Sequence, residues 1–195
     1  MRLILVRHGI TLWNQEKRIQ GHSDQPLCEV GVAEMTARQL PNELRTLAWY
    51  CSPLSRATQS ATLLGLKHAA IEPRLIEMDW GDWEGHILKP LRKKIGQPMR
   101  DNEARGVDFR PPGGESPRDV QRRVQEWART AHKKHDQCGA VVHKGIIRCV
   151  YALAKRWDMR GDSPIQFDWT AAHEFECDDD GAFSDHHRAI QLAAN

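Results

Sequence analysis

The chain has 195 residues, of which 40% are hydrophobic and 28% are charged, and its formal net charge is +2. This length and composition predict one folded domain over residues 1–195 with a sizeable buried core, and they exclude an intrinsically disordered chain. The nearly balanced charge argues against a basic surface that binds nucleic acid and against a polybasic membrane anchor. We therefore expect neither nucleic acid nor a membrane as a partner.

The five cysteines are odd in number and include no CxxC pair. That usage is typical of free thiols in a reducing compartment, and it favours neither a disulfide framework nor a zinc site. The apolar run at residues 3–6 is too short for a signal-peptide core, and no apolar segment has the length of a membrane span. We therefore expect a cytoplasmic protein.

The first part of the chain alternates short apolar runs with segments of helical hydrophobic spacing. Short apolar runs bounded by polar residues predict buried strands. Pro41 lies inside one helical pattern and is expected to break or kink it, whereas Ser55 stands at the start of another. The predicted strands cover residues 3–6, 47–51 and 69–72, and the predicted helices cover residues 30–45 and 55–66.

Residues 80–114 are rich in tryptophan, glycine, proline and charge, and we expect an irregular insertion there, with a short helix or two. A long amphipathic helix is predicted after it, with Ser116 as N-cap and Asp119 completing a variant of the capping box. Strands that alternate with helices predict an α/β fold whose sheet is covered on both faces. The later predicted helices cover residues 116–135 and 146–157, and the later strands residues 139–142, 173–177 and 189–193.

Basic side chains follow directly after several predicted strands. Arg7 and His8 follow the first strand, Arg56 lies in the first turn of the helix after the second, and His143 follows the strand at 139–142. Ligands of open α/β sheets bind outside the carboxyl ends of the strands, so these side chains are expected to share one crevice. Guanidinium groups and a helix N-terminus match the oxygens of a phosphate group.

A histidine among arginines suits covalent chemistry on phosphorus. A neutral imidazole can form a phosphohistidine, and nearby arginines would keep His8 unprotonated near neutral pH. The leaving group needs a proton, for which Glu77, placed just after the third predicted strand, is preferred over Asp79. The simpler interpretation is that the strand stops, Gly9 turns the chain and His8 is incidental.

Five motifs occur in order between Met1 and about Trp157: LVRHGITLWN, SPLSRATQSA, RLIEMDWGDWEG, GGES and VVHKGIIR. This ordered set resembles the histidine phosphatase superfamily, also called the phosphoglycerate mutase-like family. The resemblance implies a three-layer α/β/α sandwich with a mostly parallel sheet, and a chemistry that needs no metal and no cofactor. The implied roles are nucleophile for His8, proton donor for Glu77, and phosphoryl binding for Arg7, Asn14, Arg56 and His143.

One departure from the family follows the second histidine, where Lys144 replaces the usual glycine. If that position required a positive φ, lysine would cost about 1 kcal/mol. Otherwise its ammonium would add charge to the phosphate pocket or contact an anionic substrate. Lys144, Gln20 and Gly21 complete the predicted substrate-binding set. The C-terminal stretch matches the family less closely, and its adjacent His186 and His187 predict no metal site because neighbouring side chains diverge on a strand.

We expect a metal-independent phosphomonoesterase for a small phosphorylated metabolite, acting as a monomer or homodimer. A cofactor-dependent phosphoglycerate mutase would use the same residues, but the family's mutases are longer in the lid region, so this compact chain favours a phosphatase. Within the phosphatases, PPGGES loosely resembles the α-ribazole phosphatase branch, and a phosphohistidine-protein phosphatase is a further alternative. A phosphate-binding module without turnover is the non-enzymatic alternative.

Overall fold

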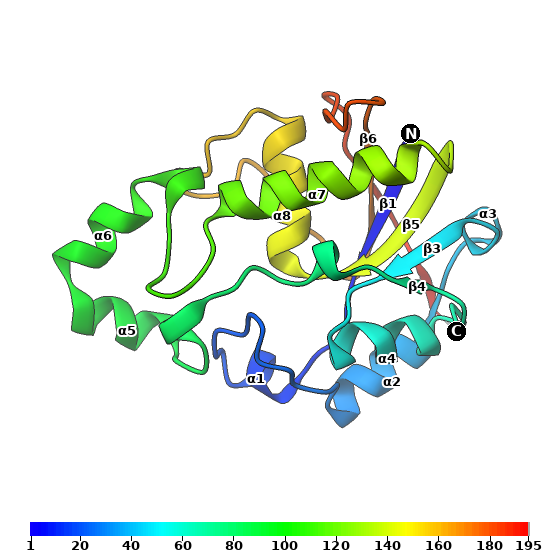
Figure 1. Ribbon diagram of the computed structural model, residues 1–195. Coiled ribbons are helices and arrows are strands. Elements are labelled where there is room, and N and C mark those ends of the chain that lie inside the picture. The colour runs from blue at the N-terminus through cyan, green and yellow to red at the C-terminus, as the bar shows by residue number, and fades with distance from the viewer. Residues whose placement is uncertain (195) are drawn as a thin grey trace.

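A six-stranded sheet lies at the centre of the computed structural model, which describes residues 1–194 (Figure 1). The strand order is β4-β3-β5-β1-β6-β7, and the pairs β1–β5, β5–β3 and β3–β4 are parallel. The antiparallel strands β6 and β7 extend the sheet beyond β1, so the predicted mostly parallel sheet is confirmed. The strands are β1 (Arg2–Arg7), β3 (Ala48–Cys51), β4 (Ala70–Ile71), β5 (Gln137–Val142), β6 (Ala172–Glu176) and β7 (Arg188–Ile190).

Helices cover both faces of the sheet, as predicted for a three-layer sandwich. Leu3 and Leu5 of β1 pack on the face covered by α7 (Pro117–His132) and α8 (Lys144–Ala154). Ile4 and Val6 pack on the opposite face, under α2 (Glu29–Ala37) and α4 (Ser55–Leu63). Successive residues of a strand point to opposite faces, so a strand covered on both sides is continuously apolar. This explains why the run at residues 3–6 has no polar position.

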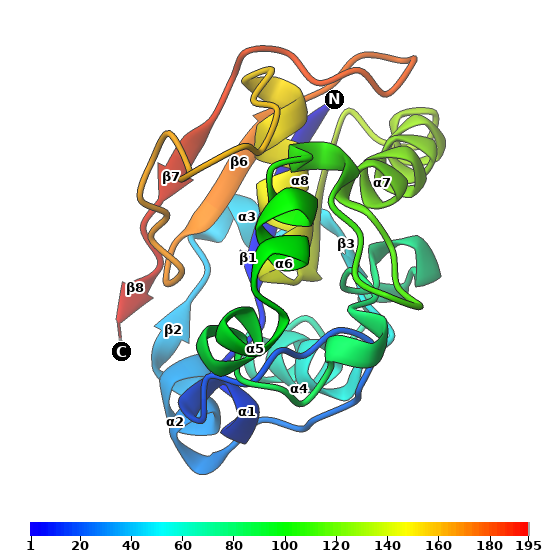
Figure 2. The same cartoon turned by 90° about the vertical axis from the view of Figure 1, so that its left-hand side faces the viewer.

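The predicted insertion contains two short helices, α5 (Leu88–Ile95) and α6 (Gln97–Glu103), which extend beyond the carboxyl ends of β1 and β5 (Figures 1 and 2). It has a small core of its own around Trp83, Leu91 and Met99. The rings of Trp80 and Trp83 both contact Phe109, so the two tryptophans pack within the insertion. The remaining short elements are α1 (Leu12–Gln15), η1 (Pro73–Leu75), η2 (Gly81–Trp83) and η3 (Gly106–Asp108).

The helix predicted over residues 30–45 is interrupted before Pro41, the residue expected to break or kink it. The first helix ends at Ala37, and Arg38 adopts an extended backbone with φ −87° and ψ 139°. A short strand, β2 (Arg38–Gln39), pairs there with β8 (Ala193–Ala194), and α3 (Asn42–Arg45) begins after Pro41. The pairing with the distant C-terminal segment overrides the local helical spacing. It also splits the predicted strand at residues 189–193 into β7 and β8.

The start of α7 confirms the predicted cap. The Ser116 hydroxyl oxygen accepts from the Asp119 backbone N–H, and the Asp119 carboxylate accepts from the Ser116 backbone N–H. Elsewhere, all five cysteines are free thiols, and burial raises the pKa of Cys51, Cys138 and Cys149 to about 12. Among the helices of residues 1–194, none combines the length and apolar character needed to cross a membrane.

A pair of neutral histidines joins β6 to the segment before β7. His173 Nε2 donates to the Asp168 carbonyl over 3.1 Å, so His173 Nδ1 accepts from His187 Nε2, also over 3.1 Å. The His187 ring packs against Tyr151 and Phe175. Burial, followed by His173, Lys155 and His186, lowers the pKa of His187 from 6.5 to about 4, and burial lowers the pKa of His173.

This pair predicts that acid destabilises the fold. Between about pH 6.5 and pH 4 the unfolded chain binds protons that the folded histidines do not, so the free energy of unfolding falls as pH decreases through this window. For half-buried His187 we expect a loss of about 1 to 2 kcal/mol after solvent screening. Urea unfolding at pH 7.5 and pH 5 measures it.

The matched variants are His187→Phe, which keeps an aromatic ring but cannot titrate, and His68→Ala at an exposed position. His187→Phe is expected to show a smaller drop in unfolding free energy between the two pH values, whereas His68→Ala leaves the drop as in the wild type. An unchanged drop in His187→Phe would contradict the assignment.

Candidate active site

The carboxyl ends of β1, β3 and β5 bring the predicted basic residues together. Arg7 of β1 lies opposite Val142 of β5, so His8 and His143 are the next residues on neighbouring parallel strands. The His8 backbone N–H donates to the Val142 carbonyl over 3.0 Å, and the two imidazole rings have centroids 5.1 Å apart. His8, His143 and Arg56 are all buried. The structure therefore assembles at this edge the cluster that the sequence predicts.

The hydrogen bond of His8 fixes its tautomer. His8 Nδ1 lies 2.6 Å from the Gly9 carbonyl oxygen, which can only accept, so Nδ1 carries the ring proton. The other nitrogen, Nε2, then has a free lone pair. Burial, followed by the charges of Arg7 and Arg56, lowers the pKa of His8 well below its ordinary value. His8 is therefore neutral at physiological pH, with Nε2 as a nucleophilic atom.

His143 is held by Ser52, a residue that the sequence analysis missed. The Ser52 hydroxyl oxygen accepts from the Leu54 N–H over 3.4 Å and lies 2.6 Å from His143 Nε2. The Ser52 hydrogen has no other acceptor within residues 1–194, so we assign it to that nitrogen. A neutral His143 consequently carries its proton on Nδ1, which is buried and has no partner within residues 1–194. Burial, followed by His8 and Arg56, lowers the pKa of His143 well below its ordinary value.

Arg56 lies at the start of α4 and is fully buried. Its two terminal nitrogens donate to the carbonyls of Ser23 (3.0 Å) and Gly21 (2.7 Å), which fixes the plane of the guanidinium. Arg56 Nε has no partner within the described residues, and the same holds for Arg7 Nε. An unpaired buried donor costs about 1 to 3 kcal/mol, so an anion that accepts from these groups would be favoured.

Three of the six unpartnered buried side-chain nitrogen and oxygen atoms within residues 1–194 belong to this one cluster: Arg7 Nε, Arg56 Nε and His143 Nδ1. All three are hydrogen-bond donors. Two guanidinium groups and a neutral imidazole thus each supply a donor without a partner in the described part of the chain. Such a set suits an anion with several acceptor oxygens, as a phosphoryl group has.

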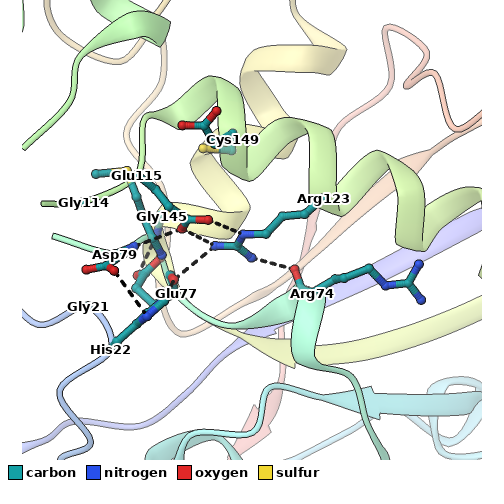
Figure 3. Close-up of polar contacts among 12 residues, drawn as sticks. Gly21, His22, Arg74, Glu77, Asp79, Gly114, Glu115, Arg123, Gly145 and Cys149 are labelled. Atoms are coloured by element: carbon teal, nitrogen blue, oxygen red, sulfur yellow. Dashed lines mark hydrogen bonds and ion pairs between the residues drawn. The ribbon is translucent and has the colours of Figure 1, made fainter. Parts of the chain in front are cut away.

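Glu77, in the segment after η1, lies beside Gly145 at the start of α8 (Figure 3). Its Oε2 accepts from the Gly145 N–H over 3.0 Å in the first turn of α8, and its Oε1 accepts from the Met78 N–H over 2.9 Å. A Cβ on residue 145 would lie 2.3 Å from Glu77 Oε1, so only glycine permits this approach. Glu77 is buried, with 8% of the residue exposed, and its charge raises the pKa of both Arg7 and Arg56 against the lowering effect of burial.

Asp79, the alternative acid, is engaged elsewhere. Its Oδ1 accepts from the Gly81 N–H over 2.8 Å, and its Oδ2 lies 3.6 Å from His22 Nδ1 (Figure 3). Neither oxygen contacts the start of α8, where Glu77 binds. The geometry therefore favours Glu77 over Asp79 as the acid next to His8 and His143.

Arg123 of α7 holds the main chain that carries Glu77, and the sequence analysis missed it (Figure 3). Its guanidinium donates to the carbonyls of Arg74 (2.6 Å) and Glu77 (3.1 Å) and binds the Glu115 carboxylate at 3.0 Å. His22 Nε2 donates to the same Glu77 carbonyl over 2.9 Å. The position of the Glu77 carboxylate thus depends on a guanidinium on the neighbouring helix.

Residues 3–189 match the model of the histidine phosphatase superfamily (branch 1). The chain belongs to this superfamily. It is 33% identical over 178 residues to phosphoserine phosphatase 1 of Hydrogenobacter thermophilus, covering 84% of this chain and 83% of that protein. It is 30% identical over 162 residues to phosphoglycerate mutase-like protein 4 of Arabidopsis thaliana, covering 78% and 70%.

The fold comparison agrees with this membership. The crystal structure of phosphoglycerate mutase from Thermus thermophilus superposes with a TM-score of 0.72 and 28% identity, covering 100% of this chain and 99% of that chain. The predicted phosphoglycerate mutase-like sandwich is therefore confirmed. Membership of the histidine phosphatase superfamily supports phosphatase or mutase activity, and the relatives include proteins named for each.

Gly9 and Asn14 of this superfamily member have defined structural roles. A Cβ on residue 9 would lie 2.6 Å from the Met35 side chain, so Gly9 is needed for close packing rather than for the left-handed backbone conformation expected of a tight turn. Asn14 Oδ1 accepts from the Thr11 N–H over 3.1 Å in a capping box at the start of α1. Asn14 Nδ2 is the donor that a phosphate oxygen would require, so phosphoryl binding by Asn14 stays a prediction.

Gln20 and Gly21 belong to the loop that holds Arg56. Gln20 Nε2 donates to the Thr11 hydroxyl over 2.8 Å, and the Gly21 carbonyl accepts from Arg56. A Cβ on residue 21 would lie 2.9 Å from the Trp80 backbone nitrogen and against the Glu84 carboxylate, so a side chain there would force the loop to shift. Substrate binding by Gln20 and Gly21 stays a prediction.

Lys144 is the first residue of α8, and His143 is the N-cap of that helix. The non-glycine residues with positive φ are Lys17, Arg156 and Met159, so Lys144 has an ordinary backbone conformation. The lysine in place of the family's glycine therefore carries no positive-φ cost, and that explanation is excluded. The helix begins two residues before the predicted start at Ile146.

The C-terminal histidines diverge, as predicted. His186 Nε2 lies 3.0 Å from the Glu174 carboxylate, whereas His187 contacts His173. Within the part of the chain that the structure describes, no group of three His, Cys, Asp or Glu side chains is arranged to hold a metal ion.

Proposed function

We propose that the chain is a phosphomonoesterase that hydrolyses a small phosphorylated metabolite through a phosphohistidine on His8, with no metal ion. The observation that carries this proposal is the contact of His8 Nδ1 with the Gly9 carbonyl oxygen at 2.6 Å. The Nδ1 proton is held by the Gly9 carbonyl, which leaves Nε2 unprotonated within a cluster of unpartnered donors. A nucleophile and the groups that stabilise charge on phosphorus are thus assembled together.

In the first step, His8 Nε2 attacks the phosphorus in line with the ester oxygen. The new N–P bond forms as the P–O bond to the leaving group breaks, and the Glu77 carboxylic acid gives its proton to the departing alkoxide. Arg7, Arg56 and His143 would donate to the equatorial oxygens. The cations of the protein supply the charge stabilisation that a metal supplies in other phosphatases.

In the second step, the Glu77 carboxylate accepts a proton from a water molecule that attacks the phosphohistidine. The N–P bond breaks, inorganic phosphate leaves, and His8 returns to its neutral form. Glu77 regains the proton that it gave away in the first step, so the cycle closes without a cofactor.

Activity assays separate phosphatase from mutase and from a binding module. We expect hydrolysis of p-nitrophenyl phosphate in the presence of EDTA, and release of inorganic phosphate in a screen of phosphorylated metabolites. The screen includes 3-phosphoglycerate with and without 2,3-bisphosphoglycerate. Conversion of 3-phosphoglycerate to its isomer without phosphate release would instead establish a mutase. Phosphate binding without any turnover would establish a binding module.

Arg123 is expected to act through the position of Glu77. Replacement by glutamine (Arg123→Gln) removes the donors to the Arg74 and Glu77 carbonyls, and we expect kcat to fall about 10-fold with little change in KM. The loss in kcat/KM, which reports the phosphorylation of His8, is expected to be larger for an alkyl phosphate than for p-nitrophenyl phosphate, because in that step only the alkoxide needs a proton from Glu77. Steady-state kinetics on both substrates measure the difference.

The neighbouring Arg122 provides the matched control. Its side chain is 69% exposed and its ion pair with Asp119 is long, at 3.5 Å. Arg122→Gln is expected to retain wild-type kinetics. Equal losses in kcat/KM for the two substrates in Arg123→Gln would indicate a general structural defect and refute a positioning role.

A further inference from the structure

Lys144 and Trp169 lie beside the proposed phosphoryl site, and the proposed mechanism uses neither. Lys144 Nζ lies 5.2 Å from the centre of the Trp169 ring system, and the guanidinium carbon of Arg7 lies 5.5 Å from it. Distances of this size are typical of cation–π contacts. One aromatic side chain therefore joins a cation of the phosphoryl site to a cation outside it.

Lys144 has no anionic partner within residues 1–194. Its side chain forms no ion pair and no hydrogen bond within these residues, and its Nζ lies over the Trp169 ring. Desolvation by neighbouring atoms, followed by the charges of Arg7 and Arg148, lowers its pKa, and Glu77 opposes this shift. Lys144 is exposed, so an anion can reach its ammonium from solvent. A lysine crowded by two arginines is a position where an anion would be stabilised.

Trp169 is held in a fixed position. Its ring stacks on Phe167 with centroids 4.8 Å apart and an interplanar angle of 19°. Asp168 Oδ1 accepts from the backbone N–H (2.9 Å) and the hydroxyl (2.6 Å) of Thr170, and the Asp168 carbonyl accepts from His173. The aromatic surface under Lys144 is therefore organised before any ligand binds, which lowers the entropic cost of placing the ammonium.

We propose that Lys144, held against Trp169, binds a second anionic group of the substrate. This inference rests on the proposed phosphatase function and names its substrate class: phosphomonoesters that carry a carboxylate or a second phosphate close to the scissile ester. The second anion must be close, because Lys144 directly follows His143 and successive Cα atoms are about 3.8 Å apart. The lysine thus determines specificity and leaves the chemical step to His8 and Glu77.

The test compares matched substrates that differ in one group. 3-Phosphoglycerate and glycerol 3-phosphate differ by a carboxylate, and fructose 1,6-bisphosphate and fructose 6-phosphate differ by a phosphate. We expect wild type to prefer the more anionic member of at least one pair. Lys144→Gln is expected to lower kcat/KM for that member about 10- to 100-fold, the effect of losing one hydrogen bond between charged groups. The other member and p-nitrophenyl phosphate are expected to change less than about 3-fold.

Two further variants strengthen the comparison. Lys144→Arg keeps the charge and is expected to keep most of the preference. Lys133→Gln removes one positive charge at the opposite end of the sheet, where α7 ends before β5 begins, and is expected to leave all constants unchanged.

Each outcome has one meaning. Equal loss on every substrate in Lys144→Gln would place Lys144 in the phosphoryl pocket and overturn the inference, and no loss would overturn it as well. Turnover of p-nitrophenyl phosphate by wild type without a preference in either pair would remove the second-anion site alone. No turnover of any substrate, p-nitrophenyl phosphate included, would remove the proposed function and this inference with it.

Discussion

The His8→Ala protein is expected to lose at least about 10⁴-fold of its kcat for p-nitrophenyl phosphate, the scale of loss seen when a covalent nucleophile is removed. No other neutral nucleophile in the cluster can replace it, because Nε2 of His143 already accepts from Ser52. Arg7, Arg56 and His143 stay in place, so binding of inorganic phosphate is expected to persist. Steady-state kinetics and calorimetric titration with phosphate measure the two effects.

The matched control for this substitution is His68→Ala, at an exposed position after α4. It is expected to retain wild-type activity. A thermal melt checks that His8→Ala folds, and we expect it to do so because the substitution removes a polar ring from a buried position. Substantial turnover by a folded His8→Ala protein would contradict the covalent mechanism.

Glu77→Gln is expected to lower kcat for an alkyl phosphate about 10²- to 10⁴-fold, the contribution of general acid–base catalysis. p-Nitrophenolate is a good leaving group that needs no proton, so phosphorylation of His8 by p-nitrophenyl phosphate is expected to proceed in this variant. Hydrolysis of the phosphohistidine is expected to be slow, because the water then has no base. A burst of p-nitrophenol followed by slow turnover, seen by stopped-flow absorbance, is the expected signature.

Asp79→Asn is the control for the choice of acid. Asparagine keeps the Oδ1 acceptor that binds the Gly81 N–H, and we expect kinetics within about 3-fold of wild type. If Asp79→Asn abolished the turnover of alkyl phosphates while Glu77→Gln left it intact, the roles assigned to Glu77 and Asp79 would be reversed. The Glu77 carboxylate accepts from two backbone N–H groups. In Glu77→Gln one of these N–H groups would face the amide NH₂ and lose its acceptor, so urea unfolding checks the stability of this variant.

The cluster at the sheet edge could be predicted from sequence because its positions follow from strand ends. A strand buried on both faces has a recognisable apolar run, and parallel strands present their carboxyl ends at the same edge. Residues directly after two such runs, His8 and His143, are then expected at the same edge, and the pairing of β1 with β5 places them side by side. Their separation follows from the β1–β5 register alone and needs no knowledge of side-chain packing.

The supporting residues could not be predicted in the same way. Arg123 lies on an amphipathic helix, where its guanidinium is indistinguishable in sequence from the solvated arginines beside it. Ser52 precedes a proline, and a Ser-Pro sequence is typical of a turn. The break at Arg38 depends on pairing with residues 193–194, which no local pattern contains. Gly9 was expected to serve a turn, whereas its role is set by the Met35 side chain packed against it.

Covalent trapping tests the central claim most directly. Glu77→Gln protein is mixed with p-nitrophenyl phosphate, quenched in alkali where phosphohistidine survives, digested and analysed by tandem mass spectrometry. The mechanism predicts a single phosphoryl group on the peptide that contains His8, at the Nε2 position by phosphorus NMR. A phosphoryl group on any other residue, or substrate consumption with no phosphorylated peptide in this variant, would contradict it.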